Sequence, residues 1–153
     1  MKCFVRKIAV ALLAVMIFSA LAGYTYAANT TFNDFTVTGH AGSYISADSP
    51  SKKTDSSAMV IYINSSSIGS SYNVRVMGSG SSILNAENCT VYNSIPADHV
   101  VCGKNTYYGI KNTVIEDGYK YASPSLMQGT AYGTVSGKWA PDSAQSYATP
   151  CAP

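Results

Sequence analysis

Residues 72–77, Tyr-Asn-Val-Arg-Val-Met, alternate apolar and polar side chains, which is the pattern of a strand with one buried face. Residues 58–63, Ala-Met-Val-Ile-Tyr-Ile, are apolar on both faces and predict a central strand that is covered on both sides. Further short segments of strand character are Thr31–Gly39, Ser43–Ala47, Cys89–Tyr92, His99–Cys102, Tyr107–Val114, Tyr119–Ala122 and Ala131–Trp139. Short strands at regular spacing, with polar turns between them, predict an all-β protein whose single domain is an antiparallel β-sandwich or a barrel-like relative of it. We expect this domain to span residues 28–139 and to be followed by an irregular C-terminal tail over residues 140–153.

Two local signals suggest how some of these strands connect. Thr31–Gly39 and Ser43–Ala47 are close enough in the chain to form a hairpin. Glu116-Asp117-Gly118 is the strongest hairpin signal in the chain, because Asp-Gly supplies the positive φ angles of a tight turn. Gly133 and Gly137 within the last strand suggest a bulge or a close approach of the backbone.

The first 27 residues have the three-part pattern of a secretory signal peptide. Met1–Lys7 is basic, Ile8–Leu21 is an unbroken run of apolar and small residues, and small residues follow. Cleavage after Ala27 is preferred over cleavage after Ala22, because a cut at Ala22 leaves almost no polar segment behind the apolar run. The alternative is a signal helix retained as a membrane anchor, but the run is shorter than the roughly 20 apolar residues that a spanning helix needs. We therefore expect a secreted, extracellular protein without a membrane span in its mature form.

Removing the signal peptide changes the charge of the protein. Three of the ten basic residues lie within it, which leaves seven basic against eight acidic residues. The remaining Lys and Arg do not form the clustered basic face that phosphate backbones require. Nucleic acid is therefore not an expected partner.

Three cysteines remain after the signal peptide, and their pairing is open. An oxidising destination makes a disulfide the default, and Cys89 with Cys102 is the favoured pair. The first alternative ties the tail to the domain through Cys151 and either Cys89 or Cys102, and the second is that no bond forms. If Cys151 is unpaired, it is a free thiol or the link of a disulfide-bonded dimer.

No constellation of catalytic residues is visible in the sequence. The domain contains only two histidines, and His40 lies in a glycine-flanked turn while His99 lies too near Cys102 along one strand to pair with it. Neither the cysteines nor the dispersed carboxylates have the spacing of a zinc or EF-hand site. We expect no catalytic residues, no metal and no cofactor.

The aromatic residues give the only positive functional signal. Ten tyrosines follow the signal peptide, and rings that combine apolar and polar character are favoured at binding faces. The candidate face consists of residues from the C-terminal half: Tyr107, Tyr119, Tyr121, Tyr132 and Trp139. The alternative is that these rings fill or border a core that is poor in leucine.

The overall pattern resembles a group of small secreted proteins of Gram-positive bacteria whose domain has no assigned function. The resemblance rests on the signal peptide, the alternating segments Tyr72–Val76 and Tyr107–Tyr121, and the closing residues 135–143, Val-Ser-Gly-Lys-Trp-Ala-Pro-Asp-Ser. It implies export and a β-rich fold, and the cysteines depart from it. The general form also resembles secreted bacteriocins of the β-sandwich kind.

These observations lead to three functional hypotheses. The first is a secreted, non-catalytic β-sandwich that binds a cell-envelope, glycan or protein partner, in the manner of a bacteriocin-like competition factor. The second is a stand-alone carbohydrate-binding module that uses surface Tyr and Trp. The third is a small secreted hydrolase.

Overall fold

The computed structural model describes residues 28–39, 42–47, 49–67, 69–81, 86–127 and 132–152. Within these ranges the chain forms strands and no helix, which confirms the all-β prediction. The strands are β1 (Asn33–Gly39), β2 (Tyr44–Ser46), β3 (Ser51–Lys52), β4 (Met59–Ser66), β5 (Ser71–Ser79), β6 (Glu87–Asn88), β7 (Val91–Tyr92), β8 (Ile95–Pro96), β9 (Val100–Gly103), β10 (Tyr107–Ile110), β11 (Tyr121–Met127) and β12 (Gly133–Ala140). The predicted signal peptide and His40 lie outside the described residues. No helix that could cross a membrane is found in the part of the chain that the structure describes.

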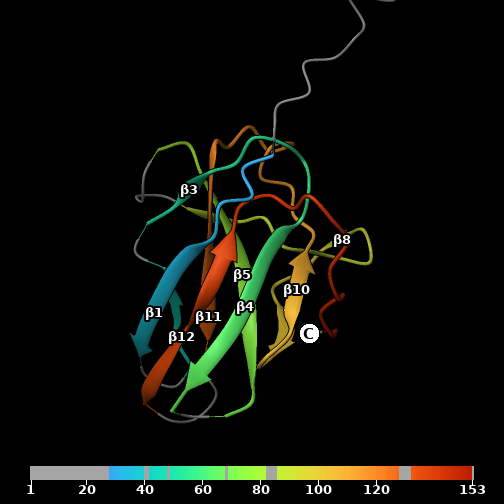
Figure 1. The fold of residues 1–153 in the computed structure, drawn as a ribbon. Helices are drawn as coiled ribbons and strands as arrows, with labels where there is room; N and C mark the ends of the chain where they lie inside the picture. Colours follow the sequence, from blue (N-terminus) through green and yellow to red (C-terminus); the bar gives the residue numbers. More distant parts are fainter. Residues whose placement is uncertain are drawn as a thin grey trace, which may run out of the picture.

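The strands form two main antiparallel sheets and one small hairpin (Figure 1). Sheet A has the order β1-β12-β4-β10, and sheet B has the order β2-β11-β5-β6, with β3 also on β11 and β9 also on β5. β7 and β8 pair only with each other. The two main sheets share no strand, so the domain is an open sandwich and not a closed barrel.

The core lies between the two sheets and follows the alternation of the strands. On β5, Tyr72, Val74 and Val76 are buried while the residues between them are only half-buried, as the sequence pattern predicts. β4 lies between β12 and β10 and is buried on both faces from Met59 to Ile61, as the sequence predicts for a central strand. Burial of these side chains is the main favourable contribution to folding, at about 25 cal/mol per Å² of apolar surface.

The predicted hairpin between residues 31–39 and 43–47 is wrong. β1 pairs with β12 along its whole length in sheet A, whereas β2 pairs with β11 in sheet B. Alternation specifies which face of a strand is buried but not which strand lies beside it. The two segments are therefore neighbours in sequence that belong to opposite sheets.

The Asp117-Gly118 turn forms, but it does not join a hairpin. Gly118 has a φ of 81°, as an Asp-Gly turn requires. The flanking strands separate, because β10 ends at Ile110 and pairs with β4 while β11 pairs with β5. Between them the amide of Asp117 donates to the carbonyl of Thr113 at 2.8 Å, which is a helical type of turn. The segment is a corner that carries the chain from sheet A to sheet B.

Gly137 provides the close backbone approach that the sequence suggests. The register between β12 and β4 shifts between Ser136 and Gly137, which marks a bulge. A Cβ at Gly137 would lie 2.1 Å from the carbonyl oxygen of Tyr62. Only glycine therefore fits beside Tyr62 at this point.

A buried ion pair joins the ends of the domain. The ammonium of Lys53 lies 2.9 Å from the carboxylate of Asp142, and both side chains are fully buried. Asp142 also accepts hydrogen bonds from the amide of Asn29 at 2.7 Å and from the amide and hydroxyl of Thr54 at 2.9 and 2.6 Å. Lys53 donates its remaining hydrogens to the carbonyls of residues 57 and 141. The pair therefore fixes the N-terminal segment, the loop after β3 and the residues after β12 to one another.

The substitution Asp142→Asn tests this ion pair. Because the ammonium of Lys53 would stay buried without a counter-charge, we expect the free energy of unfolding to fall by about 3–5 kcal/mol. Urea unfolding followed by circular dichroism measures the change. Asp34→Asn, at an exposed carboxylate on β1, is the matched control and should leave stability nearly unchanged. A loss of less than about 1 kcal/mol, as expected of an exposed pair, would contradict the role assigned to Asp142.

Acid should destabilise the protein through the same carboxylate. Burial raises the pKa of Asp142, but hydrogen bonds from Thr54, Lys53 and the Asn29 amide outweigh it and hold the pKa below its ordinary value. A carboxyl with a lowered folded-state pKa contributes stability above its unfolded pKa of about 3.9 and loses it as the pH falls through the folded-state pKa. We therefore expect the stability difference between the wild type and Asp142→Asn to shrink below about pH 4. A difference that stays constant from neutral pH into strong acid would show that Asp142 does not titrate in this way.

Candidate functional site

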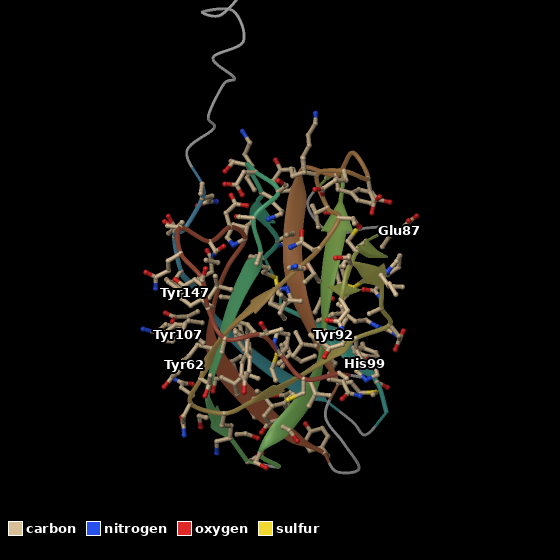
Figure 2. The ribbon with its side chains drawn as sticks, turned by 90° about the vertical axis from the view of Figure 1, so that its right-hand side faces the viewer. Tyr62, Glu87, Tyr92, His99, Tyr107 and Tyr147 are labelled. Atoms are coloured by element: carbon tan, nitrogen blue, oxygen red, sulfur yellow. The ribbon has the colours of Figure 1, made fainter. Side chains whose placement is uncertain are left out.

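An aromatic cluster lies on the outer face of sheet A. Tyr62 and Tyr107 stack with their ring centroids 4.4 Å apart and an interplanar angle of 25°. The ring of Phe32 meets Tyr107 edge-on at 5.8 Å, and the ring of Tyr147 lies on its other side at 6.1 Å. Tyr107 and Phe32 are each 40% exposed. Figure 2 shows Tyr62, Tyr107 and Tyr147 together at one side of the molecule, away from Glu87 and His99.

The strand register brings these rings together from four distant segments. Tyr107 on β10 is the direct partner of Tyr62 on β4, and both side chains point outward because their neighbours Ile61 and Tyr108 face inward. Phe32 comes from the residue before β1. Tyr147 comes from the segment after β12, which is held on β10 by a hydrogen bond from the amide of Gly109 to the carbonyl of Ala148 at 3.0 Å.

Charged side chains continue the row of the stacked pair across sheet A. The register places Lys138 of β12 opposite Tyr62, and Asp34 of β1 opposite Lys138. One row across the four strands therefore runs from a carboxylate through an ammonium to two stacked rings. Such a row offers aromatic ring edges to a ligand at one end and hydrogen-bonding groups at the other.

The predicted aromatic face does not assemble as the sequence suggested. Trp139 is only 1% exposed and belongs to the core, so it cannot contribute to a surface. Tyr119 and Tyr121 are half-buried beside sheet B, and Tyr132 is exposed but lies before the opposite end of β12. Only Tyr107 belongs to the cluster. Sequence reasoning missed the other three rings because their proximity depends on the register between distant strands.

The favoured disulfide, Cys89–Cys102, is excluded by the register of sheet B. Cys102 is the partner of Tyr72 on β5, and the amide of Cys89 donates to the carbonyl of Val76 on the same edge of β5 at 2.8 Å. Positions four residues apart along a strand are separated by about 13 Å, well beyond the roughly 7 Å that a disulfide allows between Cα atoms. All three described cysteines are free thiols. Of the two tail-tying alternatives, only Cys102 has Cys151 nearby, since Cys151 pairs with Val101.

The two buried thiols are held in their protonated form. Burial raises the pKa of Cys102 to about 12, with a further contribution from Cys151. Burial also raises the pKa of Cys89 to about 11, and the carboxylate of Asp117 adds to the effect. Because the thiolate is the reactive species, neither of these cysteines is a plausible nucleophile at neutral pH.

Alkylation tests this difference in reactivity. Treatment of the reduced native protein with iodoacetamide at pH 8 should modify Cys151, which is exposed, and leave Cys89 and Cys102 unmodified. Peptide mapping by mass spectrometry locates the label, and a sample in denaturant should be modified at all three positions. Modification of Cys102 as rapidly as Cys151 in the native protein would show that Cys102 is not buried as described.

The second histidine belongs to a surface ion cluster. The carboxylate of Asp98 lies 3.0 Å from Nδ1 of His99 and is paired with the guanidinium of Arg75, which also lies 3.6 Å above the ring of Tyr44. The hydrogen bond from His99 lowers the pKa of Asp98, and the pairing with Arg75 lowers it further. The cluster ties β5 to β2 and to the loop before β9. Within the described ranges, no group of three or more His, Cys, Asp and Glu side chains is arranged to hold a metal ion.

Comparison with known proteins assigns the chain to a family. The family model described as protein of unknown function (DUF2712) matches residues 19–143. The match includes both partners of the Lys53–Asp142 ion pair and three members of the aromatic cluster, and it ends before Tyr147. No curated protein and no solved structure matches the chain.

Proposed function

Since the chain belongs to the DUF2712 family, which has no assigned function, we propose that it is an exported, non-catalytic binding domain that acts at the cell envelope or outside the cell. The observation that carries the proposal is the aromatic cluster on sheet A. Large rings left exposed on a small folded domain are favoured where another molecule binds. Three of the rings contact the fourth, Tyr107, so Tyr107 is already held in place before a partner arrives.

Export is supported by the signal-peptide pattern of residues 1–27 together with the contacts of the residues that follow it. Asn29 lies two residues beyond the preferred cleavage site. Its backbone amide donates a hydrogen bond to the carboxylate of Asp142, and its side-chain amide donates to the carbonyl of Lys52 at 2.8 Å. Cleavage after Ala27 would therefore leave the docked N-terminal segment intact. The chain after the cut keeps every contact that fixes Phe32 near Tyr107.

A non-catalytic role is supported by the local surroundings of two carboxylates, Asp98 and Asp142, that could otherwise perform acid–base chemistry. Asp98 is shared between Arg75 and His99 at an exposed site, which is an arrangement that holds loops together. Asp142 is buried and fully engaged by Lys53 and Thr54. Both carboxylates are thus used by the fold. A competition factor of the bacteriocin-like kind would use the same aromatic surface to engage its target.

Carbohydrate binding is the second candidate, and the stacked pair favours it. The exposed edges of the two stacked tyrosine rings provide apolar surface that the apolar face of a sugar ring can contact. The adjacent Lys138 and Asp34 supply a hydrogen-bond donor and an acceptor for hydroxyl groups. A glycan polymer of the cell envelope would be a suitable ligand both for an envelope-binding domain and for a carbohydrate-binding module.

Removal of the central ring tests the binding role. The purified protein should sediment with washed bacterial cell walls, and Tyr107→Ala should weaken this binding about tenfold, because Tyr107 contacts all three other rings. Binding isotherms from supernatant depletion measure the change. Tyr132→Ala, which removes an exposed tyrosine elsewhere, is the matched control and should bind as the wild type does.

Two results would contradict the proposal. The first is a wild-type protein that does not sediment with any cell-wall preparation. The second is a Tyr107→Ala protein that sediments as strongly as the wild type. Urea unfolding of both variants confirms that a loss of binding is not a loss of folding.

A further inference from the structure

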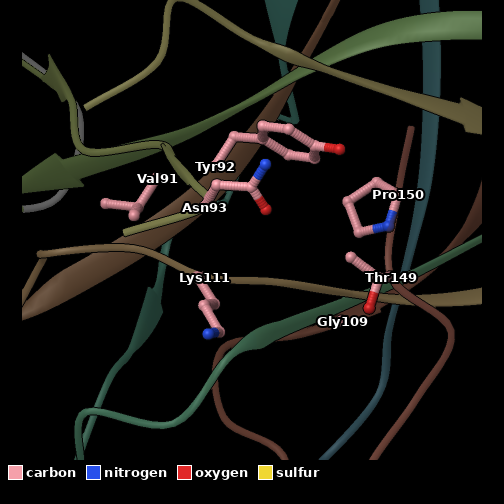
Figure 3. A pocket seen from close by; sticks show the side chains of 7 residues that line it. All are labelled: Val91, Tyr92, Asn93, Gly109, Lys111, Thr149 and Pro150. Carbon is pink, nitrogen blue, oxygen red and sulfur yellow. The ribbon is translucent and has the colours of Figure 1, made fainter. Parts of the chain in front are cut away.

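A small cavity lies beside the aromatic cluster, where the C-terminal segment meets β7 and β10. Its volume is about 210 Å³. The lining residues are Val91, Tyr92, Asn93, Gly109, Lys111, Thr149 and Pro150. Figure 3 shows Tyr92 and Asn93 on one side of the cavity, Thr149 and Pro150 on the other, and Lys111 below them. The cavity is smaller than the roughly 300–1,000 Å³ of sites that enclose drug-sized ligands, so it suits one ring-sized unit.

The C-terminal segment forms one wall of the cavity by crossing the open side of the sandwich. Ala148 is bridged to Tyr108 on β10, at the edge of sheet A, and Cys151 is bridged to Val101 on β9, in sheet B. Thr149 and Pro150 span the gap between these two attachment points. The wall is therefore fixed at both ends.

The opposite wall is formed by the β7–β8 hairpin. The amide of Val91 donates to the carbonyl of Lys111 at 2.9 Å, which holds β7 against the chain that leaves β10. Asn93 and Ser94 form the turn of the hairpin with φ angles of 50° and 64°. Two consecutive residues with positive φ are characteristic of a tight hairpin turn, and asparagine tolerates this conformation better than most residues. The turn thus presents the amide of Asn93 to the cavity.

Three polar side chains around the cavity are not used by the fold. Asn93, Lys111 and Thr149 make no side-chain hydrogen bond or ion pair within the described part of the chain. Together they offer an amide, an ammonium and a hydroxyl beside the ring of Tyr92. Lys111 is the only charged residue among those that line the cavity. A ligand with several hydroxyl groups and one negative charge would satisfy all of them.

The cavity lies close to the aromatic cluster along β10. Gly109, which lines the cavity, lies two residues beyond Tyr107 on the same face of β10, a separation of about 7 Å. A Cβ at Gly109 would lie 3.4 Å from the Cβ of Tyr147, a member of the cluster. A ligand that contacts the exposed part of Tyr107 therefore needs only one further sugar unit to reach the cavity.

We propose that this cavity is a subsite for an acidic sugar, whose carboxylate pairs with Lys111 while its hydroxyl groups bond to Asn93 and Thr149. The inference rests on the proposed function, because the aromatic cluster holds the rest of the chain of sugars. It adds a charge preference that the aromatic rings alone do not supply. The ligand class is then an anionic glycan and not a neutral one.

Titration calorimetry with two matched probes tests the subsite. The first probe is an oligogalacturonide of four units, and the second is the same oligomer fully methyl-esterified, which keeps the rings and removes the charge. The wild type should bind the charged form on the order of threefold more tightly, as expected of a partly exposed ion pair. Lys111→Met should reduce this preference, whereas Lys111→Arg should retain it.

Further variants separate the cavity from the aromatic cluster. Lys120→Met removes the same charge at an exposed site near sheet B and should keep the preference. Asn93→Gly removes the amide while allowing the positive φ, and it should weaken both probes. Tyr107→Ala should weaken both probes as well. A polymer of glycerol phosphate is a third probe, and tighter binding of it than of the oligogalacturonide would assign the site to phosphate instead of carboxylate and overturn the sugar assignment.

The remaining outcomes distinguish the two proposals. Equal binding of the charged and esterified oligomers by the wild type, or an unchanged preference in Lys111→Met, would overturn the subsite while leaving a cluster-dependent binding role intact. Failure of the wild type to bind any probe would overturn the subsite, and the cell-wall experiment with Tyr107→Ala would then decide separately on the proposed function.

Discussion

The fully buried ion pair between Lys53 and Asp142 is the interaction on which the rest of the structure depends. Taking two charges out of water is costly, and the cost is offset only because each charge meets a complete set of partners. These partners belong to the N-terminal segment, the loop after β3 and the residues that follow β12. Phe32 and Tyr147 lie a few residues from the partners, so the network helps to fix the two segments that bring these rings to the Tyr62–Tyr107 pair.

The aromatic cluster and the cavity both depend on the path of the C-terminal segment. The chain after Asp142 does not leave the domain but crosses from the edge of sheet A to sheet B. On its way it places Tyr147 against Tyr107 and forms one wall of the cavity. Apolar rings and unused polar groups therefore lie next to each other on one side of the sandwich, which is the mixture that recognition of a polyhydroxylated ligand requires.

Strand content could be predicted from the sequence, whereas strand pairing could not. The alternation in β5 is a local property, and the buried positions on that strand follow it. The same alternation in β12 places Trp139 on one face of the strand with Val135 and Gly137, whereas the polar Ser136 and Lys138 lie on the other face. This pattern already favours a buried Trp139. Strand pairing depends on contacts between segments that are far apart in the sequence, so no local residue pattern indicates which strands pair. For this reason Cys89 and Cys102 seemed adjacent, although they oppose different ends of β5.

The place of β12 in sheet A has a consequence for the time at which the protein can fold. β12 is the last of the described strands, yet it lies between β1 and β4, and among the described strands β1 pairs with β12 alone. Sheet A therefore cannot assemble until almost the whole chain has left the ribosome, since its contacts join the first strand to the last. Sheet A of a nascent chain with this topology stays incomplete until β12 has been synthesised. If the chain is exported as proposed, a channel that accepts only extended polypeptide would receive it before that sheet is complete.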